Sequence, residues 1–167
     1  EYLPVGNYVL VELSAPEGYR ISENIFFEVK DVKEIQEVVM KETPILTDIQ
    51  VNKIDAETKE SILSKDFLFG LYADKDCKHL ILAVKANEET GTAIFKSLRY
   101  GTYYIKELEA PNGYMLSDEI KEIIINDELV NVGKVYSFEY ENTRIPIKIV
   151  ETSDHTSIVP FLCCGIL

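Results

Sequence analysis

Three polar residues share a strand face with apolar neighbours, and together they have the chemistry to form a covalent crosslink. They are Lys53, Glu107 and Asn142. Because alternate residues of a β-strand point to the same side, these three side chains are predicted to point inward. Burial and mutual contact would favour a neutral amine and a neutral acid. Lys53 could then attack the side-chain carbonyl of Asn142 while Glu107 relays protons, so that ammonia leaves and an isopeptide bond remains.

The apolar neighbours of these residues lie on three predicted strands. Lys53 shares a strand face with Ile49 and Val51, and Glu107 shares one with Tyr103 and Ile105. Asn142 shares a strand face with Phe138 and Tyr140. A simpler interpretation is that each polar residue marks the end of its strand, where it reaches solvent or a nearby salt bridge. Periodicity alone favours this simpler interpretation. The two interpretations differ in whether the side chains lie in the core.

Apolar residues at every second position indicate the strands that must hold the three residues in place. Within residues 46–147 the runs are Ile49/Val51, Phe67/Phe69/Leu71, Ala93/Phe95, Tyr103/Ile105, Ile123/Ile125 and Phe138/Tyr140. Turn residues separate the runs, which is typical of an antiparallel β-sandwich. We expect an all-β domain of about seven strands in two sheets, with at most a short helical turn near residues 61–65.

One stretch of the sequence occurs twice. GNYVLVELSAPEGY (residues 6–19) recurs as GTYYIKELEAPNGY (residues 101–114), and the similarity continues through ISENI and LSDEI with the same offset of 95 residues. Two copies of one module are therefore predicted. We expect residues 1–45 to be the C-terminal part of a first domain, residues 46–147 to be a complete domain, and residues 148–167 to be a polar linker followed by a truncated hydrophobic anchor segment.

The composition is that of a globular protein and is strongly acidic. The 167 residues are 46% hydrophobic and 28% charged, with 29 acidic against 17 basic residues and a formal net charge of -12. Such a surface repels phosphate backbones and anionic lipid. We expect no nucleic-acid partner.

No other constellation of residues indicates a cofactor, a metal or a hydrolase. Cys77, Cys163 and Cys164 are too few and too badly spaced for a disulfide framework or a structural zinc site. His79 and Cys77 lie in one turn without a third ligand. Residues 153–157 contain the serine, aspartate and histidine of a triad, but a triad is assembled from distant segments, not from neighbours in a linker. We therefore expect neither a cofactor nor a metal.

The motifs resemble a known family of surface domains. They are VNKIDAET (residues 51–58), FGLY (residues 69–72), the stretch of residues 101–114, and a final strand ending in Asn142. Together they resemble the SpaA-like or Cna B-type repeat of Gram-positive surface proteins. The resemblance implies an immunoglobulin-like or prealbumin-like sandwich, present as one partial and one complete copy in tandem. It also implies a stalk or spacer of adhesins and pili, commonly closed by an isopeptide bond.

The resemblance assigns a role to each polar residue. It makes Lys53 the amine donor, Asn142 the acceptor and Glu107 the proton relay. In the partial copy, Glu12 occupies the relay position and Glu42 the acceptor position, where the family usually has asparagine or aspartate. This departure counts against a bond in the first domain, whose lysine would lie outside the sequence.

The C-terminal residues resemble a sortase sorting signal that is incomplete. Thr152 occupies the position of the threonine that sortase cleaves, while Val150 replaces the proline of the motif and Ser153 the glycine. The apolar run of residues 158–167 is about half as long as a membrane-spanning helix. Two alternatives stay open: attachment to peptidoglycan by sortase, or a plain membrane anchor. In both, only this segment contacts the membrane.

The predicted function is that of a structural stalk or spacer, displayed outside the cell on the wall or surface of a Gram-positive bacterium. The expected protein is not an enzyme, apart from one self-directed crosslinking event, and other parts of the full protein would bind a host or matrix ligand. One alternative is a ligand-binding adhesin domain, which would need an exposed apolar or aromatic groove. Another is the accessory domain of a secreted, wall-attached hydrolase. A polymerising pilin subunit is disfavoured, because no Tyr-Pro-Lys-like motif is present.

Overall fold

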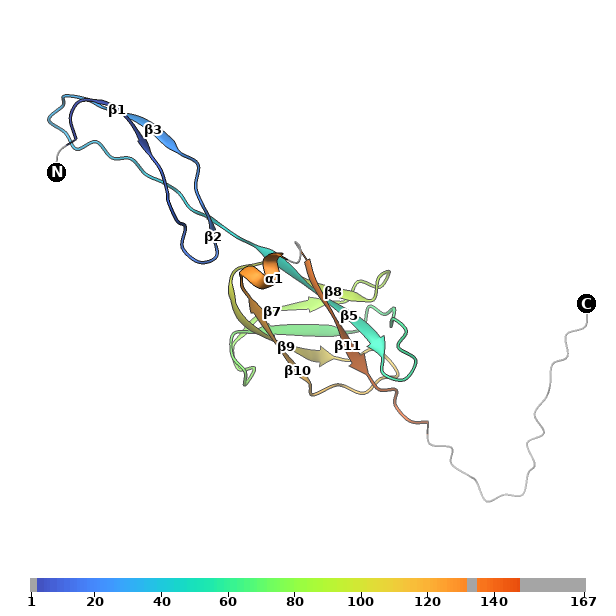
Figure 1. Cartoon of the computed structure of the whole chain (residues 1–167). Helices are drawn as coiled ribbons and strands as arrows, with labels where there is room; N and C mark the ends of the chain where they lie inside the picture. Colours follow the sequence, from blue (N-terminus) through green and yellow to red (C-terminus); the bar gives the residue numbers. More distant parts are fainter. Residues whose placement is uncertain (1–2, 132–134, 148–167) are drawn as a thin grey trace, which may run out of the picture.

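The domain of residues 46–147 is a two-layer β-sandwich, as the period-two pattern predicted. The structure is a computed structural model and describes residues 3–131 and 135–147. One sheet has the strand order β10-β9-β6-β7 and the other β11-β5-β8, so seven strands form two sheets (Figure 1). The strands are β5 (Thr47–Asp55), β6 (Leu68–Tyr72), β7 (Leu80–Lys85), β8 (Thr92–Leu98), β9 (Gly101–Glu109), β10 (Ile120–Ile125) and β11 (Val135–Asn142).

The first and last strands of the domain run parallel, although the sequence pattern led us to expect an antiparallel sandwich. β11 pairs with β5 from Val135 opposite Asp48 to Asn142 opposite Asp55, whereas the other pairs among the described strands are antiparallel. Alternation shows which face a residue occupies but not the direction of its neighbour. The parallel register places Tyr140 opposite Lys53. Asn142 is therefore the next residue on that face of β11 beyond the lysine.

The helix of the domain does not lie where the sequence suggested. Residues 61–65 are irregular apart from an isolated bridge, and the short helix α1 (Asp127–Asn131) instead connects β10 to β11. The side chain of Asn126 accepts a hydrogen bond of 3.1 Å from the backbone N–H of Leu129, as a helix N-cap does. Asp127 and Glu128 place negative charge in the first turn, which the helix dipole favours.

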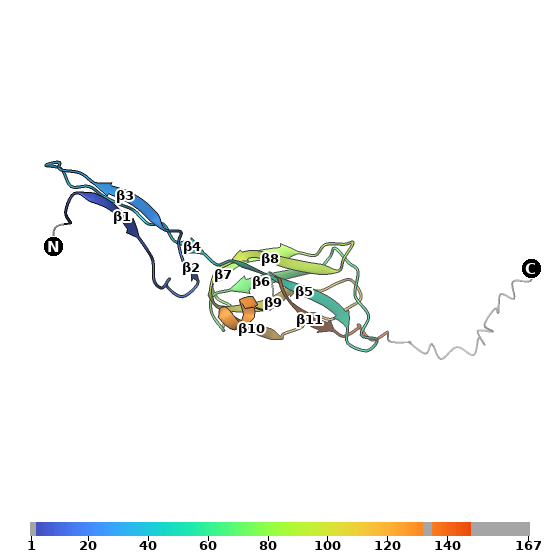
Figure 2. The same cartoon turned by 45° about the horizontal axis from the view of Figure 1, so that its top comes forward.

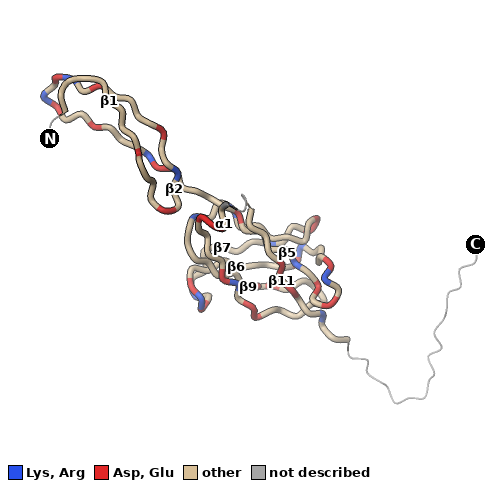
Figure 3. The backbone as a smooth tube through the Cα atoms, in the orientation of Figure 1, with Lys and Arg blue, Asp and Glu red and all other residues tan. Residues whose placement is uncertain are grey.

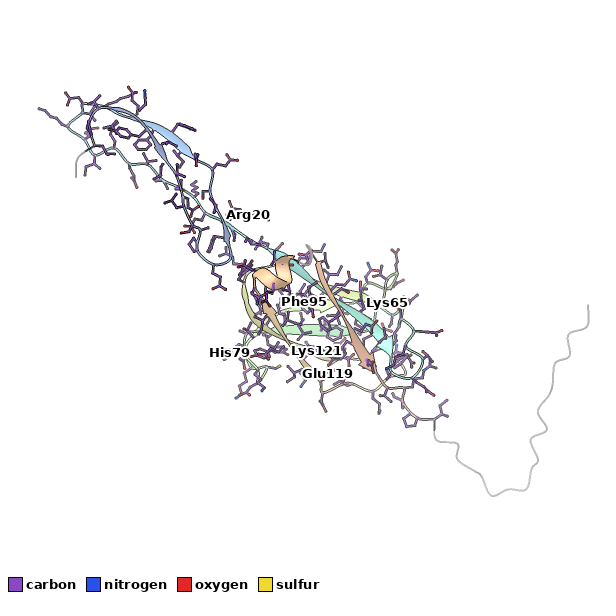
Figure 4. All side chains as sticks on the ribbon, in the orientation of Figure 1. Arg20, Lys65, His79, Phe95, Glu119 and Lys121 are labelled. Carbon is purple, nitrogen blue, oxygen red and sulfur yellow. The ribbon has the colours of Figure 1, made fainter. Side chains whose placement is uncertain are left out.

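The space between the two sheets is filled by one apolar cluster. Phe95 of β8 lies in this interior, whereas His79 lies at the periphery of the domain (Figure 4). The aromatic rings of the cluster include Phe67, Phe69, Phe95 and Tyr140, each with 0% exposure. The buried aliphatic residues of the cluster are Ile49, Val51, Leu71, Ala93, Leu98, Ile105, Ile123 and Ile125. Polar groups that enter this layer must find their partners within it.

The N-terminal unit, residues 3–45, repeats part of this architecture. β1 (Gly6–Leu10) pairs with β3 (Ile25–Val29), and β2 (Tyr19–Arg20) pairs with β4 (Thr43–Pro44). The unit extends from the end of the domain at which α1 lies (Figures 1 and 2). Between β4 and β5 there are only two residues, Ile45 and Leu46.

Equivalent hydrogen bonds in the two copies show that they share one local structure. The N–H of Tyr19 donates to the carbonyl of Pro16 at 3.1 Å, and Tyr114 N–H to Pro111 O at 3.0 Å. In the same way Ile45 N–H donates to Gly18 O and Ile145 N–H to Gly113 O. In this second pair of bonds, the acceptors Gly18 and Gly113 are 95 residues apart, but the donors Ile45 and Ile145 are 100 residues apart. The offset between the two copies therefore increases from 95 in the turn to 100 at the end of the copy.

The offset also differs by one residue between β3 and β10. In the N-terminal unit, Ile25 lies opposite Leu10. Its counterpart in the domain, Ile120, lies opposite Lys106. Lys106 corresponds to Val11 and not to Leu10, so the pairing is shifted by one residue. The sequence match of ISENI to LSDEI therefore does not extend to the strand register. A shift of one residue changes which side chains face the core. In the N-terminal unit, Phe27 and Val29 take the inward positions that Ile123 and Ile125 occupy in the domain.

Candidate functional site

The structure brings Lys53, Glu107 and Asn142 together in the core of the domain. They come from β5, β9 and β11, and their exposed fractions are 0%, 0% and 2%. This burial excludes the interpretation in which the three residues reach solvent at strand ends. A lysine and a glutamate that are fully buried must be paired, because an isolated buried charge costs several kcal/mol.

Glu107 contacts both of the other residues, one with each carboxylate oxygen. Oε1 lies 2.5 Å from Nζ of Lys53. Oε2 accepts a hydrogen bond of 2.9 Å from Nδ2 of Asn142 and another of 2.9 Å from the backbone N–H of Ser117. The second N–H of the Asn142 amide donates to the carbonyl oxygen of Met115 at 2.7 Å. These contacts hold the carboxyl group between the amine and the amide nitrogen.

Three polar atoms at this site have no hydrogen-bond partner among the described residues. They are Nζ of Lys53, Oε1 of Glu107 and Oδ1 of Asn142. The short approach of Nζ to Oε1 is an ion-pair contact, but its angles are not those of a hydrogen bond. A buried polar group without a partner costs about 1–3 kcal/mol. Nζ and Oε1 face each other in the ion pair, so Oδ1 of Asn142 is the one of the three without a polar partner among the described residues. Buried polar groups of this kind are rare in folded proteins.

Aromatic rings enclose the amine of Lys53. Its Nζ lies 4.3 Å from the ring centroid of Tyr140, 4.9 Å from that of Phe69 and 6.0 Å from that of Phe67. Burial among these rings lowers the pKa of Lys53 to about 8, against the opposing effect of Glu107. More of this amine is therefore neutral near pH 7 than of an exposed lysine. The sequence assigned these rings to the core through their spacing, but their contact with the lysine is a finding of the structure.

Asp55 is a functional candidate that the sequence analysis missed. Its carboxylate, in a residue with 2% exposure, accepts four hydrogen bonds. Oδ1 accepts from the backbone N–H groups of residues 57 and 58, and Oδ2 accepts from Tyr114 Oη at 2.8 Å and Arg144 Nε at 2.6 Å. Asp55 also lies opposite Asn142 in the β5–β11 register. The available signal was its place in the motif at residues 51–58, where only the lysine was assigned a role.

We expect Asp55 to make the stability of the domain depend on pH. The N–H of Thr58, the Arg144 guanidinium and the Tyr114 hydroxyl hold the pKa of Asp55 well below its usual range. A carboxyl with a depressed pKa stabilises the folded state above its unfolded-state pKa of about 4, and this contribution is lost as the pH falls below that value. The Asp55→Asn variant should therefore be less stable than the wild type at pH 7 and lose less of its remaining stability on acidification. Thermal unfolding over a series of pH values measures this.

The matched control for this prediction is Asp76→Asn. The carboxylate of Asp76 lies in the β6–β7 turn and is 70% exposed, so its removal should leave the acid profile nearly unchanged. If the stability of the wild type and of the Asp55→Asn variant changed with pH in the same way, the hydrogen-bonded Asp55 carboxylate would contribute no pH-dependent stability.

The N-terminal unit has a partial version of the same site. Oε2 of Glu12 accepts a hydrogen bond of 2.6 Å from the backbone N–H of Ser22, as Glu107 does from Ser117. Glu42, at the position that corresponds to Asn142, is exposed. Among the ion pairs of the described residues none involves Glu12. The N-terminal unit therefore has a carboxylate at the relay position, but no amine of the described residues forms an ion pair with it.

The remaining candidate residues lie apart from this site. Thr152 and the apolar run of residues 158–167 fall outside the described residues, as do Cys163 and Cys164. Within residues 3–131 and 135–147, no helix is long and apolar enough to cross a membrane, and no group of three His, Cys, Asp or Glu side chains is placed to hold a metal ion. The exposed imidazole of His79 contacts Asp74 at 3.0 Å, and Cys77 is a free thiol.

The solved structures that resemble this chain in fold include two from Gram-positive bacteria. The TIE protein of Bacillus anthracis matches with a TM-score of 0.70 and 27% identity, over 86% of this chain and 26% of that one. The backbone protein of the group B streptococcus pilus 2b matches with a TM-score of 0.52 and 21% identity, over 80% of this chain and 52% of that one. At such identity the pilus protein shows the fold alone.

The sequence comparisons identify the family. The trypsin-resistant surface T6 protein of Streptococcus pyogenes serotype M6 is 33% identical over 78 residues, which are 47% of this chain and 14% of that protein. The chain thus spans between about a seventh and about half of the length of these three relatives. The family model of SpaA, described as a prealbumin-like fold domain, matches residues 1–44 and 47–139. Given the sandwich fold and this match over most of its length, the chain belongs to the SpaA family of prealbumin-like fold domains.

Proposed function

We propose that residues 46–147 form a structural module of a surface or pilus protein, closed by an isopeptide bond between Lys53 and Asn142. The observation that carries the proposal is the buried contact of one carboxyl group with both the amine and the amide nitrogen. The buried polar atoms without hydrogen-bond partners add to it, because bond formation would remove the buried charge of Lys53.

The reaction conserves atoms and needs no cofactor. Glu107 first takes a proton from Lys53, which makes Nζ a neutral nucleophile. Nζ then attacks the side-chain carbonyl carbon of Asn142, and Glu107 returns that proton to Nδ2. The Glu107 carboxylate next takes the second proton that Nζ must lose to become an amide nitrogen, and it ends the reaction as a neutral acid. The bond from that carbon to Nδ2 breaks, ammonia leaves, and a secondary amide joins the two side chains. The Met115 carbonyl and Glu107 Oε2 hold Nδ2, the atom that departs.

The proposed bond would bridge the two strands through which tension enters and leaves the domain. It joins residues 53 and 142, which are 89 positions apart in the sequence and lie on adjacent parallel strands. The loop-entropy relation for disulfides, applied to this span, gives a stabilisation of about 4–5 kcal/mol. A pull along the chain would pass from β5 to β11 through a covalent bond, so that the strands between them would carry little of it.

The relatives support a place outside the cell. One is named a surface protein and another is the backbone protein of a pilus. We place this module on the wall or surface of a Gram-positive bacterium, with no catalytic activity beyond the self-crosslink. Attachment would occur through Thr152 by sortase to peptidoglycan, or through the apolar C-terminal segment to the membrane. Other parts of the full protein would bind a host or matrix ligand. Acidic residues spread over both units, which makes a nucleic-acid partner unfavourable (Figure 3).

The mass of the intact chain tests the crosslink. Loss of one ammonia lowers the mass by about 17 Da. The wild-type chain should show this deficit, whereas the Glu107→Ala variant should have the mass calculated from its sequence. Peptide mapping should locate the deficit in a peptide that contains both Lys53 and Asn142. A folded wild-type chain of unshifted mass would refute the bond and leave the three residues as a buried polar cluster.

The pH dependence of the reaction tests the relay role of Glu107. The pKa of Lys53 is lowered to about 8, so Nζ carries the proton that Glu107 would relay below that pH and has lost it above. If Glu107 must return a proton to Nδ2, the rate constant should be independent of pH below about 8 and fall above it. The measurement is the growth of the mass deficit in chains refolded from denaturant at several pH values. A rate that rises through pH 8 would show that only the neutral amine is required.

A further inference from the structure

Asn142, the proposed acceptor of the crosslink, lies where a strand ends. It is the last residue of β11, and residues 143–147 belong to none of the described strands. The ends of such elements open locally at little cost in free energy. The side-chain carbonyl of Asn142 must nevertheless stay within reach of Nζ of Lys53, because a misplacement of about 1 Å can slow such a reaction by about 100-fold. Contacts beyond the β5–β11 ladder must therefore fix its position.

Backbone hydrogen bonds from two directions hold this end of the strand. The N–H of Ala56, which directly follows β5, donates to the carbonyl oxygen of Asn142 at 2.9 Å. On the other side, residues 143–145 pair with residues 113–115 through two backbone hydrogen bonds, of 2.9 Å and 2.8 Å. Asn142 thus lies between the end of β5 and the loop that joins β9 to β10.

Asp55 ties both of these neighbouring segments to the strand that carries the lysine. It is the second residue after Lys53 on β5, and its Oδ2 accepts hydrogen bonds from Tyr114 Oη at 2.8 Å and Arg144 Nε at 2.6 Å. Tyr114 and Arg144 also lie opposite each other in an antiparallel bridge, with the guanidinium 5.9 Å from the centroid of the tyrosine ring. One carboxylate therefore holds together the two segments that flank the Asn142 amide.

The loop that contains Tyr114 also contacts the reactive groups directly. The carbonyl of Met115 accepts a hydrogen bond of 2.7 Å from Nδ2 of Asn142. The N–H of Ser117 donates to Oε2 of Glu107 at 2.9 Å. Both contacts come from the backbone, so they depend on where the loop lies and not on the side chains of these two loop residues. An anchor at the start of the loop would thus influence both contacts.

From these contacts we infer that Asp55 is a positioning residue for the crosslink. It acts through Tyr114 and Arg144, which hold the acceptor amide of Asn142 at a fixed distance from the amine. Among the hydrogen bonds and ion pairs of the described residues, none joins Asp55 to that amine or that amide. Its effect on the reaction is therefore one of geometry. The inference rests on the proposed isopeptide bond.

The test is the rate of crosslinking in variants that release one contact of Asp55 at a time. Tyr114→Phe removes only a hydroxyl, and Arg144→Met replaces a side chain that is mostly exposed, so both variants should fold. The full chain is made by chemical synthesis and kept in denaturant, so that no crosslink exists when refolding begins. The rate constant is taken from the growth of the 17 Da deficit, about one ammonia, after circular dichroism shows that folding is complete. We expect each variant to react about tenfold more slowly than the wild type.

Two further variants separate positioning from a general loss of stability. Tyr100→Phe is the matched control, because Tyr100 Oη also donates to an aspartate, Asp127 Oδ1 at 2.7 Å, at the end of the domain where α1 lies. This variant should react at the wild-type rate. Arg144→Lys retains a cation that can donate to Asp55 and should recover much of the rate lost in Arg144→Met.

The possible results distinguish failure of the inference from failure of the proposed bond. Equal rate constants for the wild type, Tyr114→Phe and Arg144→Met would overturn the positioning role and leave the bond intact. An equally slow Tyr100→Phe chain would also overturn it, since the slowing would then follow the loss of any such hydrogen bond. A wild-type chain that folds without a mass deficit would overturn the bond itself and the inference with it.

Discussion

The Glu107→Ala variant is expected to unfold at least about 12 °C below the wild-type chain, since breaking a buried ion pair costs about 3–5 kcal/mol and each kcal/mol lowers the midpoint of such a domain by roughly 4–8 °C. The substitution leaves Lys53, at 0% exposure, without its counter-charge among three aromatic rings. It also removes the partner of the Asn142 amide and of the Ser117 N–H. If the crosslink forms in the wild type, its loss enlarges the difference. Thermal unfolding followed by circular dichroism measures the change.

Two further variants separate the pair from the strand that carries it. Glu109→Ala makes the same substitution at the exposed end of β9 and should change the midpoint by only a degree or two. The double variant Lys53→Met, Glu107→Leu replaces the pair by apolar side chains and should recover much of the stability lost in Glu107→Ala, because no charge remains buried. A Glu107→Ala protein as stable as the Glu109→Ala protein would contradict the role of Glu107 as the counter-charge of Lys53.

The Phe69→Ala variant is expected to lose about 3–5 kcal/mol of unfolding free energy, as large-to-small substitutions of buried aromatic residues do. Phe69 is 0% exposed and packs edge-to-face on Tyr140 and Phe67, at centroid distances of 4.9 Å and 5.8 Å. Its ring also lies 4.9 Å from the Lys53 amine. Removal of the ring would admit water to the amine and return the lysine pKa toward its ordinary value. Denaturant unfolding measures the stability, and the rate of mass loss measures the reaction.

The control for this prediction is Phe26→Ala, the same substitution at a residue that is 81% exposed. It should leave the unfolding of the domain unchanged. The Phe69→Leu variant retains most of the volume and should cost less than Phe69→Ala. If Phe69→Ala and Phe26→Ala were equally stable, the interior between the sheets would not be packed as the structure describes.

The sequence alone predicted the features that depend on local order along the chain. Alternation placed Lys53, Glu107 and Asn142 on inward faces, and the apolar runs between turn residues matched six of the seven strands within residues 46–147. None of the runs corresponds to β7. The repeat of residues 6–19 at 101–114 identified two copies of one module, and the motifs identified the family. These features are readable because the two-residue period of a strand and the conformational preferences of turn residues act over a few neighbouring positions.

Features that depend on partners distant in the sequence were decided only by the tertiary structure. Alternation gives the face of a residue but neither the direction nor the register of the strand beside it, so the parallel pairing of β5 with β11 was not predicted. That pairing sets Asn142 beside Asp55, and the stacking of the two sheets brings Glu107 into contact with Lys53 and Asn142. The four hydrogen bonds of Asp55 and the aromatic rings around Lys53 likewise join separate segments. Packing in three dimensions, which no local pattern encodes, turned three inward-facing residues into one site.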